Sequence, residues 1–222
     1  MTKHTIITKT HPYHIISEQY IKLKTTIDYT SFDMQLNVIN ITSTVPEEGK
    51  TVTALNLANV YAQTKKRVLL IDMDFRHPNI HNAFHIDNVG GLTGYATGQL
   101  KLEDTITHIS DYFDIMHSGE KIPFPAELLT SRKVSDMMKK LRECYDMIII
   151  DCPPLSVVAD ASIISKLADG TLYVVASRQA DRDIIKRSTK ELQNNGIHII
   201  GTVLTKVKKR DVFYGNGYYY AS

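Results

Sequence analysis

The fold of this chain is decided by the stretch Asn37-Val-Ile-Asn-Ile-Thr-Ser43-Thr-Val-Pro-Glu-Glu-Gly49-Lys50-Thr51. Its first six residues form a short, apolar run that predicts a buried strand. The stretch ends in Gly-Lys-Thr and leads into an amphipathic segment, Val52–Thr64, that predicts a helix. In a phosphate-binding loop, N–H groups at a helix N-terminus hold phosphate oxygens, and the lysine reaches the β- and γ-phosphates. The second half of that motif is present in its strand–loop–helix setting, whereas Thr44 replaces the first glycine.

Five further segments resemble the first strand, because they are short, apolar and rich in Ile, Val and Leu. They are Arg67–Met73, Phe113–His117, Asp146–Ile150, Thr171–Ala176 and His198–Leu204. Amphipathic stretches alternate with them at Lys133–Cys144, Ala159–Leu167 and Arg182–Asn194, and one more, about Ser17–Tyr29, precedes the first strand. This order predicts an α/β fold of the P-loop NTPase type, with a mainly parallel sheet between two layers of helices. Gly90–Gly98 and Ser118–Pro125 are expected to be loops.

Acidic residues follow two of the predicted strands. Asp72 and Asp74 belong to Asp-Met-Asp-Phe-Arg76, and Asp151 opens Asp-Cys-Pro-Pro. Because α/β sheets bind ligands at the carboxyl ends of their strands, these carboxylates are expected beside the phosphate loop, where they can hold magnesium. An isolated aspartate there is more often a helix cap, but three together favour a binding site. Arg76 is expected to face either phosphate or a surface carboxylate.

Composition limits the class of protein. The chain has 222 residues, a net charge of +2 and 43% hydrophobic residues, which is typical of a globular domain. It has neither an apolar run of the roughly 18 residues that a membrane span needs nor a signal-peptide start. Its two cysteines, Cys144 and Cys152, offer no disulfide framework, in keeping with a reducing cytoplasm. The near-neutral charge argues against nucleic acid as a partner.

The end of the chain is rich in tyrosine. Four of the twelve tyrosines, Tyr214, Tyr218, Tyr219 and Tyr220, lie within the last nine residues. Two glycines and the absence of apolar periodicity predict a flexible tail. We expect one domain over residues 17–206, with an N-terminal extension (1–16) and the tail (207–222). A tyrosine-rich tail beside a nucleotide-phosphate site leads us to expect that the protein phosphorylates its own end.

Taken together, these motifs resemble those of the cytoplasmic tyrosine kinases of bacterial capsule and exopolysaccharide systems, the BY-kinase family. That family has a Walker A loop, an Asp-x-Asp-x-Arg motif, a Walker B motif ending in Asp-x-Pro-Pro, and a C-terminal tyrosine cluster, and all four occur here in order. Pro123–Ser131 and Gly201–Leu204 also match. The resemblance implies an ATP- and Mg²⁺-dependent protein-tyrosine kinase that phosphorylates its own tyrosine cluster and regulates polysaccharide synthesis or export.

The resemblance also implies a role for each motif residue. Lys50, Asp72 and Asp74 would be catalytic, with Asp72 accepting or orienting the phenol proton. The nucleotide would be bound by Glu48, Gly49, Lys50, Thr51 and Val52, the metal by Thr51, Asp72 and Asp151, and phosphate would be added to Tyr214, Tyr218, Tyr219 and Tyr220.

Partners follow from the same resemblance. It implies a membrane-spanning activator, the polysaccharide co-polymerase, which would keep this cytoplasmic chain at the inner face of the cell membrane. It also implies a tyrosine phosphatase and a homo-oligomer, in relatives a ring. In the assembly motif of this chain, Ile21 and Lys24 replace the two arginines that relatives have.

Two other classes fit the same motifs. A partitioning-type switch ATPase would carry a second lysine in the loop, where this chain has Val45. A catalytically weak scaffold of the same fold, docked on the membrane co-polymerase, is favoured by Glu47, which stands where relatives have glycine. A carboxylate there is expected to repel phosphate, and its Cβ to strain a turn that glycine permits.

Overall fold

A seven-stranded sheet forms the centre of the protein, whose computed structural model describes residues 5–30, 32, 34, 36–156 and 160–208. The strand order is β3-β4-β2-β5-β1-β6-β7, and only β3 runs antiparallel to its neighbour. The strands are β1 (Val38–Ser43), β2 (Val68–Asp72), β3 (Thr107–Ser110), β4 (Phe113–Met116), β5 (Met147–Asp151), β6 (Gly170–Ala176) and β7 (Ile199–Thr205). The predicted α/β class is confirmed, and all six predicted strands are present.

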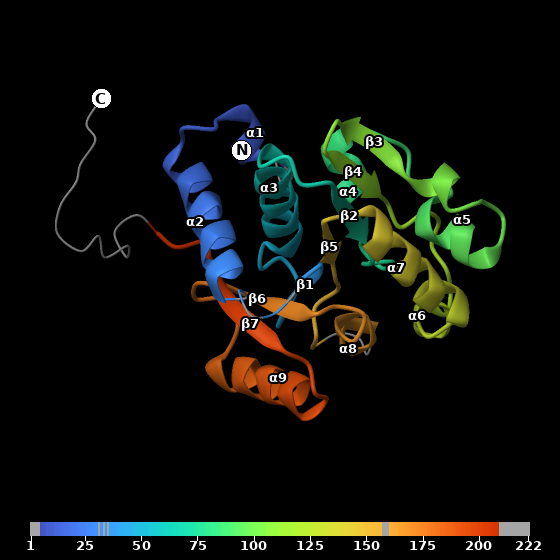
Figure 1. Cartoon of the computed structure of the whole chain (residues 1–222). Coiled ribbons are helices and arrows are strands. Elements are labelled where there is room, and N and C mark those ends of the chain that lie inside the picture. The colour runs from blue at the N-terminus through green and yellow to red at the C-terminus, as the bar shows by residue number, and fades with distance from the viewer. Residues whose placement is uncertain (1–4, 31, 33, 35, 157–159, 209–222) are drawn as a thin grey trace.

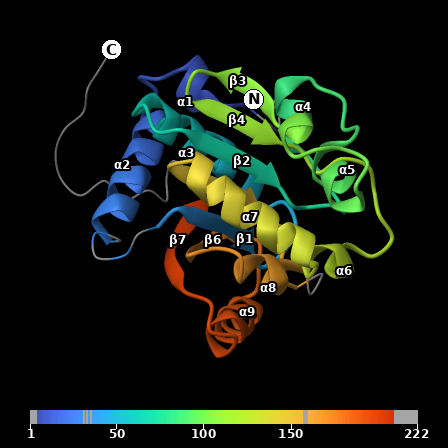
Figure 2. The same cartoon turned by 45° about the vertical axis from the view of Figure 1, so that its right-hand side comes forward.

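Helices cover both faces of the sheet (Figures 1 and 2). One face carries α2, α3 and α4, and the other carries α5 to α9. The helices are α1 (Ile7–Thr10), α2 (Ile15–Thr30), α3 (Lys50–Gln63), α4 (Ile80–Phe84), α5 (Gly91–Thr97), the 3₁₀ turn η1 (Glu103–Thr105), α6 (Pro125–Leu129), α7 (Arg132–Cys144), α8 (Asp160–Ser165) and α9 (Arg182–Asn194). In the described part of the chain, no helix is long and apolar enough to span a membrane.

Alternation along the strands creates two separate cores. In β2, Leu69 and Ile71 pack on the α7 side, whereas Val68 and Leu70 pack on the α3 side. Successive strand residues point to opposite faces, so a strand that is apolar throughout must be covered on both. Every residue of β1, β2 and β5 is buried, which fixes the carboxyl ends of these three central strands in place.

The expectation that Gly90–Gly98 forms a loop is wrong. Residues Gly91–Thr97 form α5, between Gly90 (φ 81°) and Gly98 (φ 87°). Gly91 is required by close packing, because a Cβ at this position would lie 2.4 Å from the His117 carbonyl oxygen. Glycine is common in loops, but it is also required where two backbone segments pack closely. Composition does not distinguish these two reasons for a glycine.

The short elements α6 and η1 were not predicted, and neither were β3 and α1. Strand β3 is a half-exposed edge strand, so it lacks the apolar run that marks the buried strands. Within the predicted extension, residues 5–10 pack against α3: the Thr8 N–H donates to Asn56 Oδ1 at 3.0 Å, and Asn59 Nδ2 donates to Thr8 Oγ1 at 2.9 Å. This segment therefore supports the helix that begins at Lys50.

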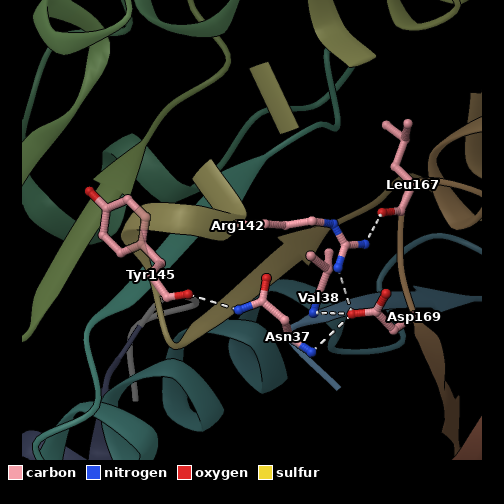
Figure 3. A network of polar contacts seen from close by, with 6 residues as sticks. All are labelled: Asn37, Val38, Arg142, Tyr145, Leu167 and Asp169. Atoms are coloured by element: carbon pink, nitrogen blue, oxygen red, sulfur yellow. Dashed lines mark hydrogen bonds and ion pairs between the residues drawn. The ribbon is translucent and has the colours of Figure 1, made fainter. Parts of the chain in front are cut away.

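A half-buried carboxylate anchors the start of β1 (Figure 3). Asp169 Oδ2 accepts hydrogen bonds from the N–H groups of Asn37 at 2.9 Å and Val38 at 2.7 Å, and from Arg142 Nη1 at 2.8 Å. Arg142 Nη2 also donates to the Leu167 carbonyl at 3.0 Å. Burial alone would raise the pKa of Asp169, but the Arg142 guanidinium and the two N–H groups together hold it below its usual value. The network joins β1, α7 and the turn before β6.

We expect Asp169→Asn to lower the free energy of unfolding at pH 7 by about 2–3 kcal/mol, because charge-assisted hydrogen bonds to a partly buried group are lost. The folded-state pKa is depressed, so this stabilisation is present above the unfolded pKa and disappears as the pH falls through the folded pKa. Urea unfolding at pH 7 and in the acid range below the usual pKa of about 3.9 measures the difference.

The control for this prediction is Asp136→Asn, which removes an exposed carboxylate of α7 that pairs only with Arg132 and Lys139 at the surface. Surface pairs contribute about 0–1 kcal/mol, so this control should change stability little. A deficit of Asp169→Asn that stays the same from neutral to acid pH would contradict the assigned role of the charge.

Candidate functional site

The phosphate loop lies between β1 and α3, as the sequence predicts. Gly49, with φ 94°, precedes the first residue of α3, and the side chain of Lys50 is 7% exposed. The Thr53 N–H donates to the Gly49 carbonyl at 2.9 Å, which starts the helical hydrogen bonds. The N–H groups before Thr53 belong to the first turn, where a helix leaves donors for an anion. The loop therefore has the geometry of an anion site.

Glu48 has its side chain turned into the protein. Its Oε2 atom accepts from the Val45 N–H at 2.9 Å and its Oε1 atom accepts from the Ala176 N–H at 3.0 Å. The residue is fully buried. Of the predicted nucleotide-binding residues, Glu48 therefore offers a bound anion its backbone and not its carboxylate.

The two strand-end aspartates lie side by side. Asp72 ends β2 and Asp151 ends β5, and the two residues are register partners in neighbouring parallel strands. Neighbouring strands are about 4.8 Å apart, so their carboxylates share one small space at the sheet edge. Both residues are buried, and Asp74 is 7% exposed. The structure thus brings together the three carboxylates that the sequence singled out.

Asp151 has an unused acceptor. Its Oδ1 atom is buried without a hydrogen-bond partner. Burial raises the pKa of Asp151 to about 7, against the opposing effects of the Lys50 charge and the Thr51 hydroxyl, and the charge on Asp74 raises it further. An unpaired buried carboxylate oxygen is costly unless a cation or a donor completes it. The position next to Lys50 and Thr51 therefore fits a bound cation.

Asp72 has a second task, because it caps α4. Its Oδ2 atom accepts from the N–H groups of Asn79 at 2.9 Å and Ile80 at 3.0 Å, and its Oδ1 atom accepts from the Asp74 N–H at 3.1 Å. Burial, followed by the charge of Asp151, raises its pKa well above the usual range, although the two α4 N–H groups act in the opposite direction. The capping interpretation of this aspartate is therefore confirmed, and its role in the site stays a prediction.

Of the two partners expected for Arg76, the structure shows a carboxylate. Arg76 Nε donates to Asp160 Oδ2 at 3.2 Å, and the Asp160 side chain is only 4% exposed. Asp160 is the first residue of α8, so the ion pair joins the segment after Asp74 to the helix that follows β5. Arg76 faces a buried partner.

The protein alone does not build a complete metal site. Among the described residues, no group of three or more His, Cys, Asp or Glu side chains is arranged to hold an ion. Magnesium commonly takes only one or two protein oxygens and completes its shell with water and substrate phosphate. The Asp151 carboxylate and the Thr51 hydroxyl suit that pattern. The tail tyrosines lie outside the described residues.

Sequence reasoning missed the contacts that hold the loop in place. Glu48 is bonded to Ala176, 128 positions away, and Thr205 Oγ1 donates to the Glu48 carbonyl at 2.6 Å. Asp160, the partner of Arg76, was also missed. That Glu48 lies next to Ala176 and Thr205, and Arg76 next to Asp160, can be recognised only when the order of the strands is known.

Known proteins resemble this chain along most of its length. Residues 39–214 match the family model described as the CobQ/CobB/MinD/ParA nucleotide binding domain. "Tyrosine-protein kinase YwqD" of Bacillus subtilis (strain 168) is 36% identical over 217 residues, which cover 96% of this chain and 90% of that protein. A "putative tyrosine-protein kinase in cps region" of Klebsiella pneumoniae is 33% identical over 90% of this chain but only 28% of its own length. The solved kinase domain of Escherichia coli tyrosine kinase ETK superposes with a TM-score of 0.89 at 30% identity, covering 98% of this chain and 87% of that domain.

Proposed function

This chain belongs to the CobQ/CobB/MinD/ParA nucleotide-binding family and, within it, to the bacterial tyrosine kinases, and on that basis we propose that it transfers the γ-phosphoryl group of ATP to tyrosine. The first acceptors are Tyr214, Tyr218, Tyr219 and Tyr220 at its own end. The observation that carries the proposal is Asp151, whose unpartnered buried Oδ1 lies where the phosphate loop and the strand-end carboxylates meet.

In this proposal the phosphate loop binds the nucleotide. The first-turn N–H groups of α3 hold phosphate oxygens, and Lys50 binds the β- and γ-phosphates. Thr51, Asp72 and Asp151 would hold Mg²⁺, which when bound neutralises charge on the phosphates during transfer. Phosphoryl transfer requires positioning and charge neutralisation more than covalent participation of the protein. These residues supply both kinds of interaction.

Asp72 is proposed to manage the proton of the acceptor tyrosine. A carboxylate has about four acceptor positions, and the three backbone N–H groups on Asp72 leave one on Oδ1, which the metal shell and the phenol proton would occupy at different stages of the reaction. A tyrosine hydroxyl has a pKa near 10, so its proton must be accepted or oriented by a placed base. Asp74 lies two residues after Asp72, and its Oδ1 accepts from the His77 N–H at 3.0 Å.

For regulation and partners we propose only the classes of protein and process that are involved. The protein would act in capsular or extracellular polysaccharide synthesis or export, which is supported by a relative named for a cps region. A membrane-spanning activator, the polysaccharide co-polymerase, would bind it at the cytoplasmic face of the membrane. A tyrosine phosphatase would reverse the modification, and a homo-oligomer would present the tail of one copy to the site of another.

The experiment is to incubate the purified chain with Mg·ATP, with and without the cytoplasmic segment of a candidate activator, and to probe for phosphotyrosine. Phosphotyrosine that requires ATP supports the kinase. ATP binding without phosphotyrosine in either condition would favour the scaffold class, for which the exposed Glu47 is the motivating residue. ATP-dependent dimerisation without phosphotyrosine would favour the switch ATPase.

We expect Glu47→Gly to tighten ATP binding several-fold. Glu47 is exposed and has φ 62°, a left-handed conformation that costs a non-glycine residue about 1–3 kcal/mol. Glycine adopts it freely and also removes a negative charge from the loop. Calorimetry on both proteins measures the change, and Glu47→Gln separates charge from conformation. Equal affinities for all three would show that the carboxylate at this position does not influence the bound phosphates.

A further inference from the structure

The phosphate loop has a strained backbone conformation that must be stabilised by contacts with the rest of the protein. Two of three consecutive residues are left-handed, Glu47 with φ 62° and Gly49 with φ 94°. Such conformations persist only where surrounding contacts over-determine them. The residue between them, Glu48, is fully buried.

The Glu48 carboxylate makes the first of two anchoring contacts. Through Oε2 it closes the loop on itself, at the Val45 N–H, and through Oε1 it ties the loop to the Ala176 N–H at the end of β6. Both oxygens are satisfied by backbone donors, which is what a buried carboxylate requires. The Glu48 side chain therefore fixes the loop to the end of the sheet through hydrogen bonds.

Thr205 makes the second anchoring contact. Its hydroxyl donates to the Glu48 carbonyl at 2.6 Å, and Thr205 is the register partner of Ala176 at the ends of β7 and β6. The two anchors therefore belong to one rigid pair of strands. A third contact, from Gln179 Nε2 to the Pro46 carbonyl at 2.7 Å, is exposed to solvent and is expected to add less.

We infer that Glu48 and Thr205 are positioning residues that clamp the phosphate loop to β6 and β7, and that nucleotide affinity depends on this clamp. The inference rests on the proposed binding of ATP. When these contacts hold the loop, its N–H groups are already positioned for phosphate. Without them the loop must become ordered when phosphate binds, and the entropy cost of that ordering weakens binding. Neither side chain is required to touch the reacting atoms, so the step after binding should be little affected.

The test compares Thr205→Val and Glu48→Gln with the wild type. Valine has nearly the shape of threonine but no hydroxyl, so only the donor to Glu48 is lost. Glutamine has one acceptor oxygen, so its amide NH₂ is left facing a backbone N–H. The matched control is Glu191→Gln, which makes the same charge change at an exposed position of α9.

ATP affinity is measured by calorimetry, KM and kcat by phosphotyrosine formation, and folding by circular dichroism and thermal melting. We expect Glu48→Gln to weaken ATP binding roughly tenfold or more and Thr205→Val by several-fold, since a buried donor or acceptor is left unsatisfied. The KM for ATP should rise in parallel, with kcat at saturating ATP within about twofold of wild type, and the control Glu191→Gln should bind ATP as the wild type does.

Wild-type affinity in both variants would overturn the clamp. So would loss of melting temperature and kcat without a change in KM, because that is the result of a merely structural contact. If Glu48→Gln does not fold, Thr205→Val decides alone. The affinity measurement is independent of catalysis: a wild type that binds ATP but forms no phosphotyrosine would refute the proposed kinase, and the variant affinities would still decide the clamp.

Discussion

Replacing Lys50 by methionine should reduce tyrosine phosphorylation by at least about 100-fold, the usual effect of removing one group that stabilises transition-state charge. Methionine keeps the length and apolar stem of lysine but carries no charge. Lys50 is almost fully buried at the start of α3, so solvent cannot replace its ammonium group. Its charge also reaches Asp151, where it opposes the rise in pKa that burial causes.

The measurement is phosphotyrosine formed per chain after incubation with Mg·ATP, together with ATP affinity and the melting temperature. Lys190→Met on α9 is the matched control, because it makes the same chemical change at an exposed position. It should leave phosphorylation at the wild-type level. More than about a tenth of wild-type activity in Lys50→Met, with the fold intact, would refute the assigned role of the loop lysine.

Local sequence was enough to predict the parts of this site that depend on a single element. Each of the six predicted strands lies within one residue of its observed bounds, because buried parallel strands are apolar throughout. Asp72 and Asp151 could be placed at strand ends from that pattern alone. Their proximity followed from a general rule about parallel sheets, without knowledge of the strand order.

Other parts of the site depend on contacts between distant segments. The clamp at Glu48 needs Ala176 and Thr205, 128 and 157 positions away, and no periodicity in the sequence encodes either pairing. Helix α5 was missed for a related reason, since the glycines that suggested a loop are there to admit the backbone at His117. In both cases the residue type marked a position of structural importance. The role of the residue depended on which element packs against it, and the sequence does not show that.

The second large effect is expected at the tyrosine cluster. Replacing Tyr214, Tyr218, Tyr219 and Tyr220 together by phenylalanine should remove nearly all phosphate incorporation, because phenylalanine has no hydroxyl to accept it. Several tyrosines of the domain are unsuitable acceptors. Tyr61 and Tyr173 are fully buried, and Tyr145 donates its hydroxyl to Asp114 at 2.7 Å.

Two exposed tyrosines outside the cluster provide the control. Tyr13 is 95% exposed and Tyr29 is 78% exposed, so both are accessible to another copy of the chain. The double variant Tyr13→Phe, Tyr29→Phe should incorporate as much phosphate as wild type. Mass spectrometry of the active protein locates the phosphates. Modification confined to Tyr13 and Tyr29, with the cluster unmodified, would contradict the proposal.

The same four-tyrosine variant should also be unable to change its assembly state in response to ATP. Each phosphotyrosine adds about −1.5 to −2 charges, so a fully modified cluster adds roughly −6 to −8. That exceeds what Lys206, Lys208, Lys209 and Arg210 can neutralise, and it would repel the tail from the carboxylates at Asp72 and Asp151. Light scattering with the activator segment present should therefore show a lower mass for the phosphorylated wild type, restored by phosphatase, and a constant mass for the variant. If wild-type mass is the same before and after phosphatase, the tail does not control assembly.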